Sequence, residues 1–393
     1  MAGVEVGHAT IISDLPRHAA PPTRVRTGVT VLFPRGRKDA RPVYAGFFSL
    51  NGNGEFTGTH WIEESGFLNG PVGLTNTLSV GTVHSALVEW WLERRGSGPD
   101  ADWTLPAVAE TWDGYLNDIA GRHVRGEHVR SAIDAAAGGP VTEGSVGGGT
   151  GMVAYEFKAG IGTSSRRLGE RDGGYTVGVL VQANHGRREQ LRIAGVPVGR
   201  EITEGAFKSR EAGSVVVLVA TDAPLLPGQL KRLARRGALG IARGGSTSGN
   251  GSGDLMLAFS TGNPAAGVGS EVVQLVDLPN HRLDPLFGAC VEATEEAVYN
   301  AMLQATSTTG VAFQRDPYQH YRWERDHEAV HVLSAGAARQ GKGGTKRCYG
   351  AGGEEMAPSS LWLTDGVPRC PSRTTPAFAR AGLEQVPRRP GPR

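Results

Sequence analysis

Residues 249–254 read Gly-Asn-Gly-Ser-Gly-Asp and lead directly into the apolar run LMLAF at 255–259. The residues before them, IARGGSTSGN at 241–250, are rich in glycine and serine, which is typical of a loop. The apolar run is short and uncharged, which is typical of a buried strand. Ser252 therefore lies at a predicted boundary between a flexible loop and a rigid, buried strand.

The peptide bond between Gly251 and Ser252 has features that favour self-cleavage. Gly251 has no side chain to shield its carbonyl, and glycine adopts strained conformations closed to other residues, so the Ser252 hydroxyl can take over the acyl group. Hydrolysis of that ester leaves Ser252 as a new N-terminus. Its α-amine has a reference pKa of about 7.7–8.0 and is a suitable general base for its own hydroxyl. The alternative interpretation of the same residues is an ordinary hairpin turn.

Several long strings occur in an order that resembles one enzyme family. They are VRTGVTVLFPRG (25–36), NGNGEFTGTHWIEESG (51–66), GPVGLTNTLSVG (70–81), EGSVGGGTGMVAYEFKAGIGTSSR (143–166), VGVLVQANHG (177–186), VATDAPLLPGQLKRLARRGALGIAR (219–243) and NGSGDLMLAFSTGN (250–263). Over about residues 3–310 the chain resembles the self-processing aminopeptidases that include DmpA-type L-aminopeptidase/D-esterases and β-peptidyl aminopeptidases. The resemblance implies an α/β fold, a four-layer αββα sandwich, made as one inactive chain that splits before Ser252 into two associated subunits.

The resemblance also implies catalytic roles for four further residues. Tyr155 and Asn184 would stabilise the oxyanion, although a structural hydrogen bond and a turn cap are the respective alternatives. Glu292 would orient Ser252 and balance the charge of the ammonium group. Cys290 stands where the β-peptidyl branch has a serine, and a packed small hydrophobe is its alternative role. Residues two apart diverge on a helix, so Cys290 and Glu292 can cooperate only if the helix expected at 285–305 starts after them or leaves one side chain outside the site.

Substrate binding requires a group that holds the free ammonium of the residue to be removed. Glu143, Glu63 and Glu64 are acidic residues inside the family strings, and Trp61 is a candidate aromatic wall. Asp222 follows a predicted strand and is either a site residue or a turn cap. The expected reaction is removal of N-terminal residues from small peptides, amides or esters through a Ser252 acyl-enzyme.

Composition defines the expected setting of the enzyme. The chain has 393 residues, 39% of them hydrophobic, and 58 glycines, which predicts a globular fold with many tight turns. We expect one catalytic domain made of an α subunit (1–251) and a β subunit (252–311), followed by a basic, disordered tail (312–393). Three cysteines and eleven histidines form no disulfide framework, zinc pattern or HExxH motif, so no metal or cofactor is expected.

The net charge is only +2, so no nucleic-acid partner is expected. The sequence has no apolar stretch long enough to span a membrane, so no membrane partner is expected either. We expect a cytoplasmic homo-oligomer of processed αβ units. Hydrophobic patterning predicts strands at 175–183 and 214–220 and helices at 83–95, 105–118, from Pro227 to Gly237, and at 285–305.

Two other functions compete with this interpretation. The string GGGTG at 147–151 resembles the phosphate-binding loop of tubulin-like GTPases, although Met152 and Val153 depart from that pattern. The second alternative is an inactive relative that acts as a binding or scaffold protein. One uncut band on a denaturing gel would favour the inactive relative, and two fragments that meet at Ser252 would favour the enzyme.

Overall fold

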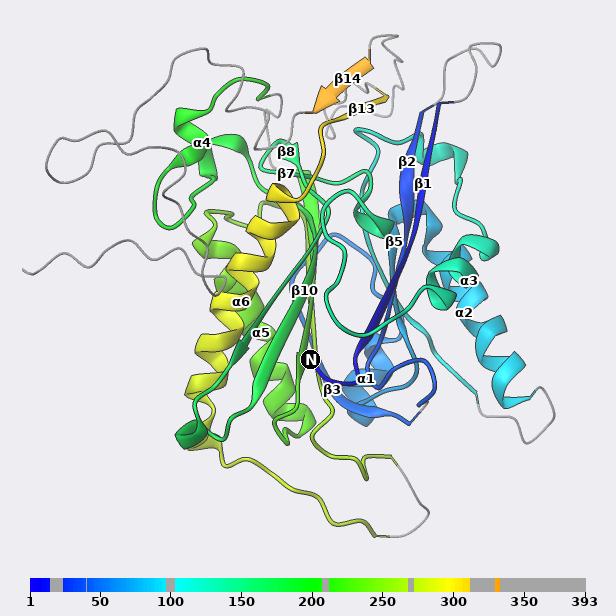
Figure 1. The fold of residues 1–393 in the computed structure, drawn as a ribbon, viewed down its shortest axis with the longest axis vertical. Coiled ribbons are helices and arrows are strands. Elements are labelled where there is room, and N and C mark those ends of the chain that lie inside the picture. The colour runs from blue at the N-terminus through cyan, green and yellow to red at the C-terminus, as the bar shows by residue number, and fades with distance from the viewer. Residues whose placement is uncertain are drawn as a thin grey trace, which may run out of the picture. The chain divides into compact units, whose positions relative to one another are not determined.

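Two β-sheets lie face to face in the computed structural model, and helices cover the outer face of each sheet (Figure 1). The structure describes residues 1–14, 24–39, 41–96, 103–206, 212–267, 272–311 and 329–332, all within one compact unit, Met1–Lys342. The order helix, sheet, sheet, helix confirms the predicted four-layer sandwich.

The first sheet contains four strands and is covered by α2 and α3 (Figure 1). Its order is β1 (Glu5–Asp14), β2 (Arg24–Phe33), β5 (Val72–Asn76) and β6 (Ala107–Thr111). The strands β5 and β6 run parallel, and α2 (Val80–Arg95) forms the crossover that parallel neighbours require. Helix α3 (Gly126–Asp134) packs beside α2.

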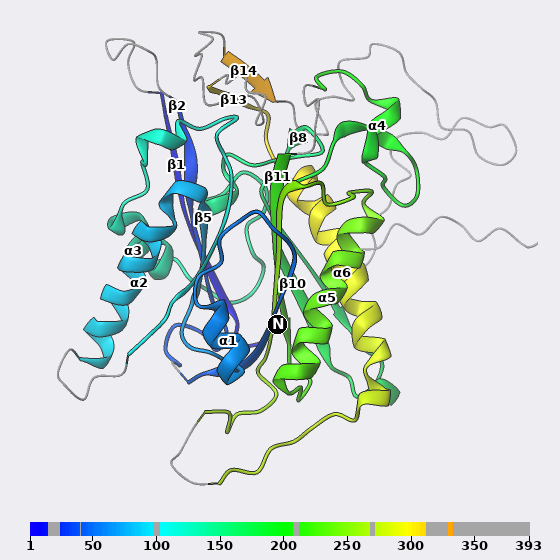
Figure 2. The same cartoon turned by 180° about the vertical axis from the view of Figure 1, so that it is seen from behind.

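The second sheet contains six strands, with the strand that carries Ser252 at its centre. Its order is β4 (Phe67–Leu68), β3 (Val43–Gly52), β12 (Gly251–Ser260), β11 (Ala212–Thr221), β10 (Thr176–Asn184) and β9 (Ile161–Arg167). Helix α5 (Pro227–Arg243) connects the parallel strands β11 and β12. It lies beside α6 (Asp284–Leu303) on the outer face of this sheet (Figure 2).

Short elements complete the described chain. They are α1 (Thr59–Ser65), α4 (Val198–Glu201), β7 (Val153–Ala154), β8 (Phe157–Lys158), β13 (Thr308–Val311), β14 (Ala329–Val332) and 3₁₀ turns at Thr77–Ser79, Ile119–Gly121, Gly147–Gly149, Glu170–Asp172, Arg188–Gln190 and Asn280–Arg282. Of the predicted tail at 312–393, only β14 is described, and it pairs antiparallel with β13. The rest of the predicted tail lies outside the described residues.

The alternating pattern of β12 explains why this strand belongs at the centre. Leu255, Leu257 and Phe259 are buried between the two sheets. Met256 and Ala258 point the other way and are buried among the residues that face α5 and α6. A strand that is apolar on both faces must be covered on both sides, and the four-layer arrangement provides this.

Close contacts between layers account for part of the glycine content. A Cβ atom placed on Gly162 of β9 would lie 2.0 Å from the Ala297 carbonyl oxygen of α6, well inside van der Waals contact. Glycine at this position lets the helix approach the sheet closely. The surplus of glycine therefore reflects packing as well as turns.

Most predicted elements are confirmed, and one helix is wrong. The strands predicted at 175–183 and 214–220 and the helix at 285–305 correspond to β10, β11 and α6. The helix expected at 105–118 is instead β6, because Ala107–Thr111 is buried and pairs in parallel with β5. Helix α5 continues past Gly237 to Arg243, because Gly237 packs closely on Val217 and Met256 rather than ending the helix.

The carboxyl group of Asp113 is buried in the fold just after β6. It accepts a hydrogen bond from Asn117 Nδ2 at 3.0 Å, and burial raises its pKa to about 7, against the opposing effect of hydrogen bonds from Thr27, Asn117 and Asn76. The folded protein therefore binds a proton on the Asp113 carboxyl more tightly than the unfolded chain does. The protonated carboxyl stabilises the fold most below pH ~4. This contribution is lost as the pH rises to about 7.

We expect Asp113→Asn to flatten the dependence of stability on pH between 5 and 8. The shift from 3.8 to about 7 corresponds to roughly 4 kcal/mol over the full titration. Urea unfolding at several pH values, measured in a Ser252→Ala background that keeps the chain intact, provides the measurement. Asp134→Asn is the control, because that side chain is 72% exposed. An unchanged pH dependence in Asp113→Asn would show that Asp113 does not titrate in this range.

Candidate active site

Ser252 is the second residue of β12, and its side chain is fully buried. Its Oγ donates a hydrogen bond of 2.6 Å to Asp254 Oδ1. The two side chains meet because residues two apart share one face of a strand. Asp254 is itself buried and is not among the site residues predicted from the sequence. The structure thus gives the candidate nucleophile an adjacent carboxylate that can accept its proton.

The residues before Ser252 form a turn that two asparagines hold. Ser252 N donates to the Gly249 carbonyl oxygen at 2.8 Å, which closes the turn. Asn51 Nδ2 donates to the same oxygen at 2.7 Å, and Asn53 Nδ2 donates to the Gly251 carbonyl oxygen at 2.9 Å. Asn51 lies at the end of β3, which pairs with β12, and Asn53 directly follows that strand. The predicted loop-to-strand boundary is confirmed, because β12 begins at Gly251.

Tyr155 lies at the same end of the second sheet as Ser252. It occupies the β7–β8 turn with a φ of 48°, is fully buried, and its N donates to the His185 carbonyl oxygen at 2.7 Å. His185 follows β10, and a Cβ atom placed on Gly213 would lie 3.0 Å from His185 Cα. Gly213 is the register partner of Ser252 on β11. His185, which sequence reasoning missed, therefore lies between Tyr155 and the strand pair that carries Ser252.

Asn184 also lies at this end of the sheet, but its side chain is already engaged. Its Oδ1 accepts from Val153 N at 2.9 Å and its Nδ2 donates to the Trp112 carbonyl oxygen at 2.8 Å. Trp112 follows β6 of the first sheet, so the amide points into the space between the sheets. The geometry supports a role in fastening β7 and the loop after β6.

The structure contradicts the predicted pairing of Cys290 and Glu292 with Ser252. Helix α6 starts before both residues, so their side chains diverge. Cys290 Sγ is buried against α5, 3.6 Å from the Leu233 carbonyl oxygen, and burial raises the pKa of the thiol to about 12. Glu292 forms an ion pair with Arg166 Nε at 3.3 Å.

The position of Arg166 shows how far Glu292 is from the candidate nucleophile. Arg166 pairs with Val177, which pairs with Thr221, which pairs with Ser260 at the opposite end of β12. Glu292 therefore marks the far end of the sheet. The spacing of Cys290 and Glu292 alone could not predict a contact with Ser252, because the spacing does not show which end of the sheet these helix residues lie against.

We expect Glu292→Gln to leave self-cleavage and kcat/KM within about twofold of the wild-type values. The side chain is 55% exposed, and surface substitutions outside a site usually change energies by about 0.5 kcal/mol or less. Gel analysis and initial-rate assays of the purified variant provide the measurement. A loss of ten-fold or more in either quantity would restore Glu292 to the site.

Two of the predicted substrate-binding carboxylates have structural partners instead. Glu143 Oε1 accepts from both Thr163 N and Thr163 Oγ1 at 2.6 Å and so fixes the edge strand β9. Asp222 Oδ1 accepts from Thr176 N at 2.7 Å and caps the turn next to β10. Thr176 begins β10 at the end of the sheet remote from Ser252. Asp222 therefore lies too far from Ser252 for the predicted substrate-binding role, whereas that role of Glu143 stays a prediction.

The remaining predicted substrate-binding residues lie on α1. Trp61 packs edge-on against Trp103 with ring centroids 5.0 Å apart. Glu63 forms a surface ion pair with Lys231, and Glu64 is exposed. None of these contacts reaches Ser252. The structure therefore gives Trp61 a packing role and leaves Glu63 and Glu64 on the solvent face of the helix.

A different carboxylate, Glu110 of β6, lies close to Gly253, the residue after the candidate nucleophile, on the face of β12 that looks towards the first sheet. It is buried, and it accepts hydrogen bonds from Glu55 N at 3.0 Å and from Thr77 Oγ1. A Cβ atom placed on Gly54 would lie 3.1 Å from Glu110 Oε1 and 3.4 Å from Gly253 Cα. Burial raises the pKa of this carboxyl. Glu110 was missed because its segment was predicted to be a helix.

The glycine-rich loop at 147–151 is packed inside the fold. Gly147 N and Gly148 N already donate to Thr10 Oγ1 and Thr30 Oγ1. A Cβ atom placed on Gly148 would lie 2.2 Å from Gln182 Oε1. These amides already donate to protein side chains, and the loop is packed too closely to admit a phosphate group. The structure therefore contradicts the nucleotide-binding alternative.

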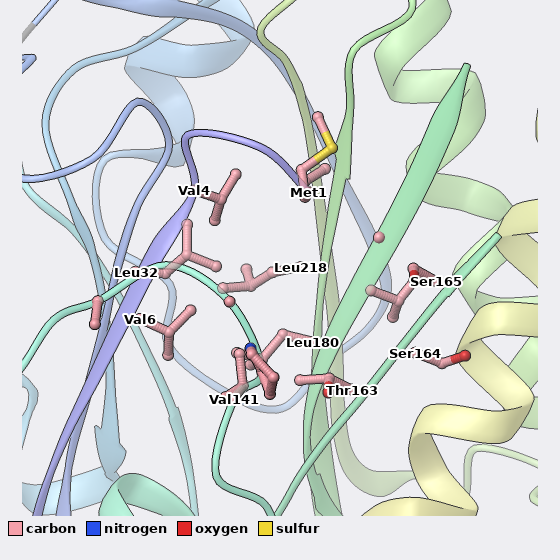
Figure 3. A pocket seen from close by; sticks show the side chains of 16 residues that line it. Met1, Val4, Val6, Leu32, Val141, Thr163, Ser164, Ser165, Leu180 and Leu218 are labelled. Atoms are coloured by element: carbon pink, nitrogen blue, oxygen red, sulfur yellow. The ribbon is translucent and has the colours of Figure 1, made fainter. Parts of the chain in front are cut away.

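A cavity of about 220 Å³ lies between the two sheets (Figure 3). Val6 and Leu32 line it from the first sheet, and Leu180 and Leu218 line it from the second (Figure 3). Leu218 pairs with Leu257 in the middle of β12, so this cavity does not open onto the candidate nucleophile.

Among the residues that the structure describes, no group of three or more His, Cys, Asp or Glu side chains is arranged to hold a metal ion. None of the helices in the same residues has both the length and the apolar composition needed to cross a membrane.

Two proteins of similar sequence are named as β-peptidyl aminopeptidases. The protein named beta-peptidyl aminopeptidase BapA from Sphingosinicella microcystinivorans is 48% identical over 345 residues, which cover 82% of this chain and 85% of the relative. The protein of the same name from Sphingosinicella xenopeptidilytica is 45% identical over 326 residues, covering 79% and 81%.

Solved structures give the same result for the fold. A Burkholderia sp. beta-aminopeptidase matches with a TM-score of 0.74 and 45% identity, covering 86% of this chain and 90% of its own. The L-aminopeptidase D-Ala-esterase/amidase from Ochrobactrum anthropi, described as a variant of the Ntn hydrolase fold, matches with a TM-score of 0.75 and 43% identity, covering 86% and 91%. The profile of Peptidase family S58 matches residues 1–315, so the chain belongs to this family of serine-type aminopeptidases.

Proposed function

We propose that the chain cuts its own bond between Gly251 and Ser252, and that the freed Ser252 then removes N-terminal residues from small peptides, amides or esters. The observation that carries this proposal is the 2.6 Å hydrogen bond from Ser252 Oγ to the buried Asp254 carboxylate. It gives the serine an acceptor for its proton at the point where β12 begins.

The first stage is an acyl shift followed by hydrolysis. Ser252 Oγ attacks the Gly251 carbonyl carbon while its proton moves to Asp254 Oδ1. The bond between that carbon and Ser252 N breaks, and the nitrogen takes the proton from Asp254. The resulting ester reacts with water, which leaves a carboxylate on Gly251 and restores the Ser252 hydroxyl beside a free α-amine.

The second stage uses the new N-terminus on a substrate. The α-amine of Ser252 accepts the proton of its own hydroxyl, which attacks the substrate carbonyl and expels the amine or alcohol. Tyr155 is the proposed oxyanion donor, since it lies at the same end of the sheet. Asn184 supports that region through its two backbone bonds. Glu110 binds the substrate ammonium, in place of the acidic residues expected from sequence.

Substrate choice follows from the relatives and from Glu110. Because the 48% and 45% identical relatives are named β-peptidyl aminopeptidases, we propose that N-terminal β-residues are accepted. The partners described for the buried Glu110 carboxylate are a backbone N–H and a hydroxyl, neither of them a cation. A free ammonium group of the substrate can therefore pair with its charge. Assembly into homo-oligomers of processed αβ units stays a prediction.

The test compares β-alanyl and L-alanyl p-nitroanilides with their N-acetylated forms. We expect release of p-nitroaniline only from substrates with a free amine, together with two fragments that meet at Ser252. Equal rates on the acetylated forms would refute an aminopeptidase that recognises the ammonium. An uncut chain without turnover would instead support the inactive binding or scaffold relative.

A further inference from the structure

The carbonyl oxygen of Gly251 has a side-chain partner before any reaction begins. Asn53 Nδ2 donates to it at 2.9 Å. This oxygen is the one that becomes negatively charged when Ser252 Oγ attacks the carbonyl carbon. We propose that Asn53 is a catalytic residue of self-cleavage and that its amide stabilises this oxyanion; the inference rests on the self-cleavage proposed above.

The backbone holds Asn53 in this position. β3 and β12 pair through Gly52 and Gly253, and the register shifts between Asp254 and Leu255. A Cβ atom placed on Gly253 would lie 2.5 Å from the Asn53 carbonyl oxygen, so the two backbones are in close contact at this point. Asn53 is therefore positioned by the sheet rather than by its own side-chain contacts.

Asn51 provides a second, different contact on the same turn. Its Nδ2 donates to the Gly249 and Ser248 carbonyl oxygens at 2.7 and 3.3 Å. Ser248 has a φ of 52°, a left-handed conformation that is uncommon for a residue with a side chain. Asn51 thus fixes the shape of the turn, whereas Asn53 touches the reacting group. The Asn51 amide therefore positions the turn, and the Asn53 amide stabilises the charge on the reacting oxygen.

The chemistry needs no further reactant beyond the water already required. As the new C–O bond forms, the carbonyl π electrons move onto the oxygen that Asn53 holds. The tetrahedral centre then collapses, the C–N bond breaks, and Ser252 N takes the proton held by Asp254. An N–H donor aimed at such an oxygen is worth about 10²–10³ in rate. Loss of the Asn53 donor should therefore slow splitting by this factor.

The experiment follows splitting of the full-length chain after a short pulse of cell-free translation. We expect Asn53→Asp, which has nearly the same shape but no N–H donor, to lower the first-order rate by about 100-fold or more. Asn53→Gln keeps the donor and should split faster than Asn53→Ala. Asn300→Asp is the matched control, since Asn300 Nδ2 also donates to a backbone carbonyl, that of Thr163, at 2.8 Å. The control should stay within about twofold of wild type.

Each result decides between defined alternatives. Wild-type splitting in Asn53→Asp overturns the role of Asn53 but leaves the proposed function intact, whereas an unsplit wild-type chain overturns the proposed function itself. Thermal unfolding of Asn53→Asp in a Ser252→Ala background shows whether the variant folds. If it does not fold, the comparison of Asn53→Gln with Asn53→Ala decides, and equal rates in those two variants overturn the inference.

Discussion

Replacing Ser252 by alanine is expected to leave one full-length chain of 393 residues that has no measurable aminopeptidase activity. The variant lacks the oxygen that attacks the Gly251 carbonyl, so the bond stays intact. It also lacks the nucleophile and the freed amine of the second stage. Loss of a nucleophile in enzymes of this kind lowers turnover by at least about a thousand-fold. Intact-mass spectrometry and a p-nitroanilide assay provide the two measurements.

Ser260→Ala is the matched control for this variant, because Ser260 lies on the same strand. Its Oγ donates to the Ala223 carbonyl oxygen at the other end of β12. We expect this control to split and to remain active. Fragments that meet at position 252 in the Ser252→Ala protein would refute the mechanism, because no other side chain in the proposal can form the ester.

The position of Ser252 could be predicted because it depends on local sequence. A glycine-rich segment followed by an uncharged apolar run specifies a loop and a buried strand within one short window. The four-layer arrangement came from the resemblance, which spans most of the catalytic chain. These features need no knowledge of which distant segments meet.

The partners of Ser252 could not be predicted in the same way. Asn53 reaches Gly251 across 198 positions of sequence, and only the pairing of β3 with β12 brings them together. Glu110 comes from the other sheet, on a strand whose apolar residues also fit a helix. The spacing of Cys290 and Glu292 agreed with a pattern, but helical geometry turns the two side chains in different directions.

Replacing Glu110 by glutamine is expected to lower kcat/KM for β-alanyl p-nitroanilide by about 30- to 5,000-fold. Removing one partner of a buried charge pair costs about 2–5 kcal/mol, which corresponds to this range. The glutamine oxygen can still accept from Glu55 N, and the Thr77 hydroxyl, which donates to the other carboxylate oxygen, can instead accept a hydrogen bond from the amide NH2. The variant should therefore fold and split, so that two fragments accompany the loss of turnover.

A substrate without an amine separates charge recognition from a general disturbance of the site. The propionyl anilide lacks the ammonium, so its low rate should be nearly the same in Glu110→Gln and in wild type. Glu63→Gln is the matched control, because that carboxylate pairs with Lys231 on the surface and should not alter kcat/KM for either substrate. If Glu110→Gln slowed both substrates equally, the carboxylate would be supporting the strands around Ser252 rather than binding the ammonium. Selective loss on the amine substrate follows only from direct contact between the two charges.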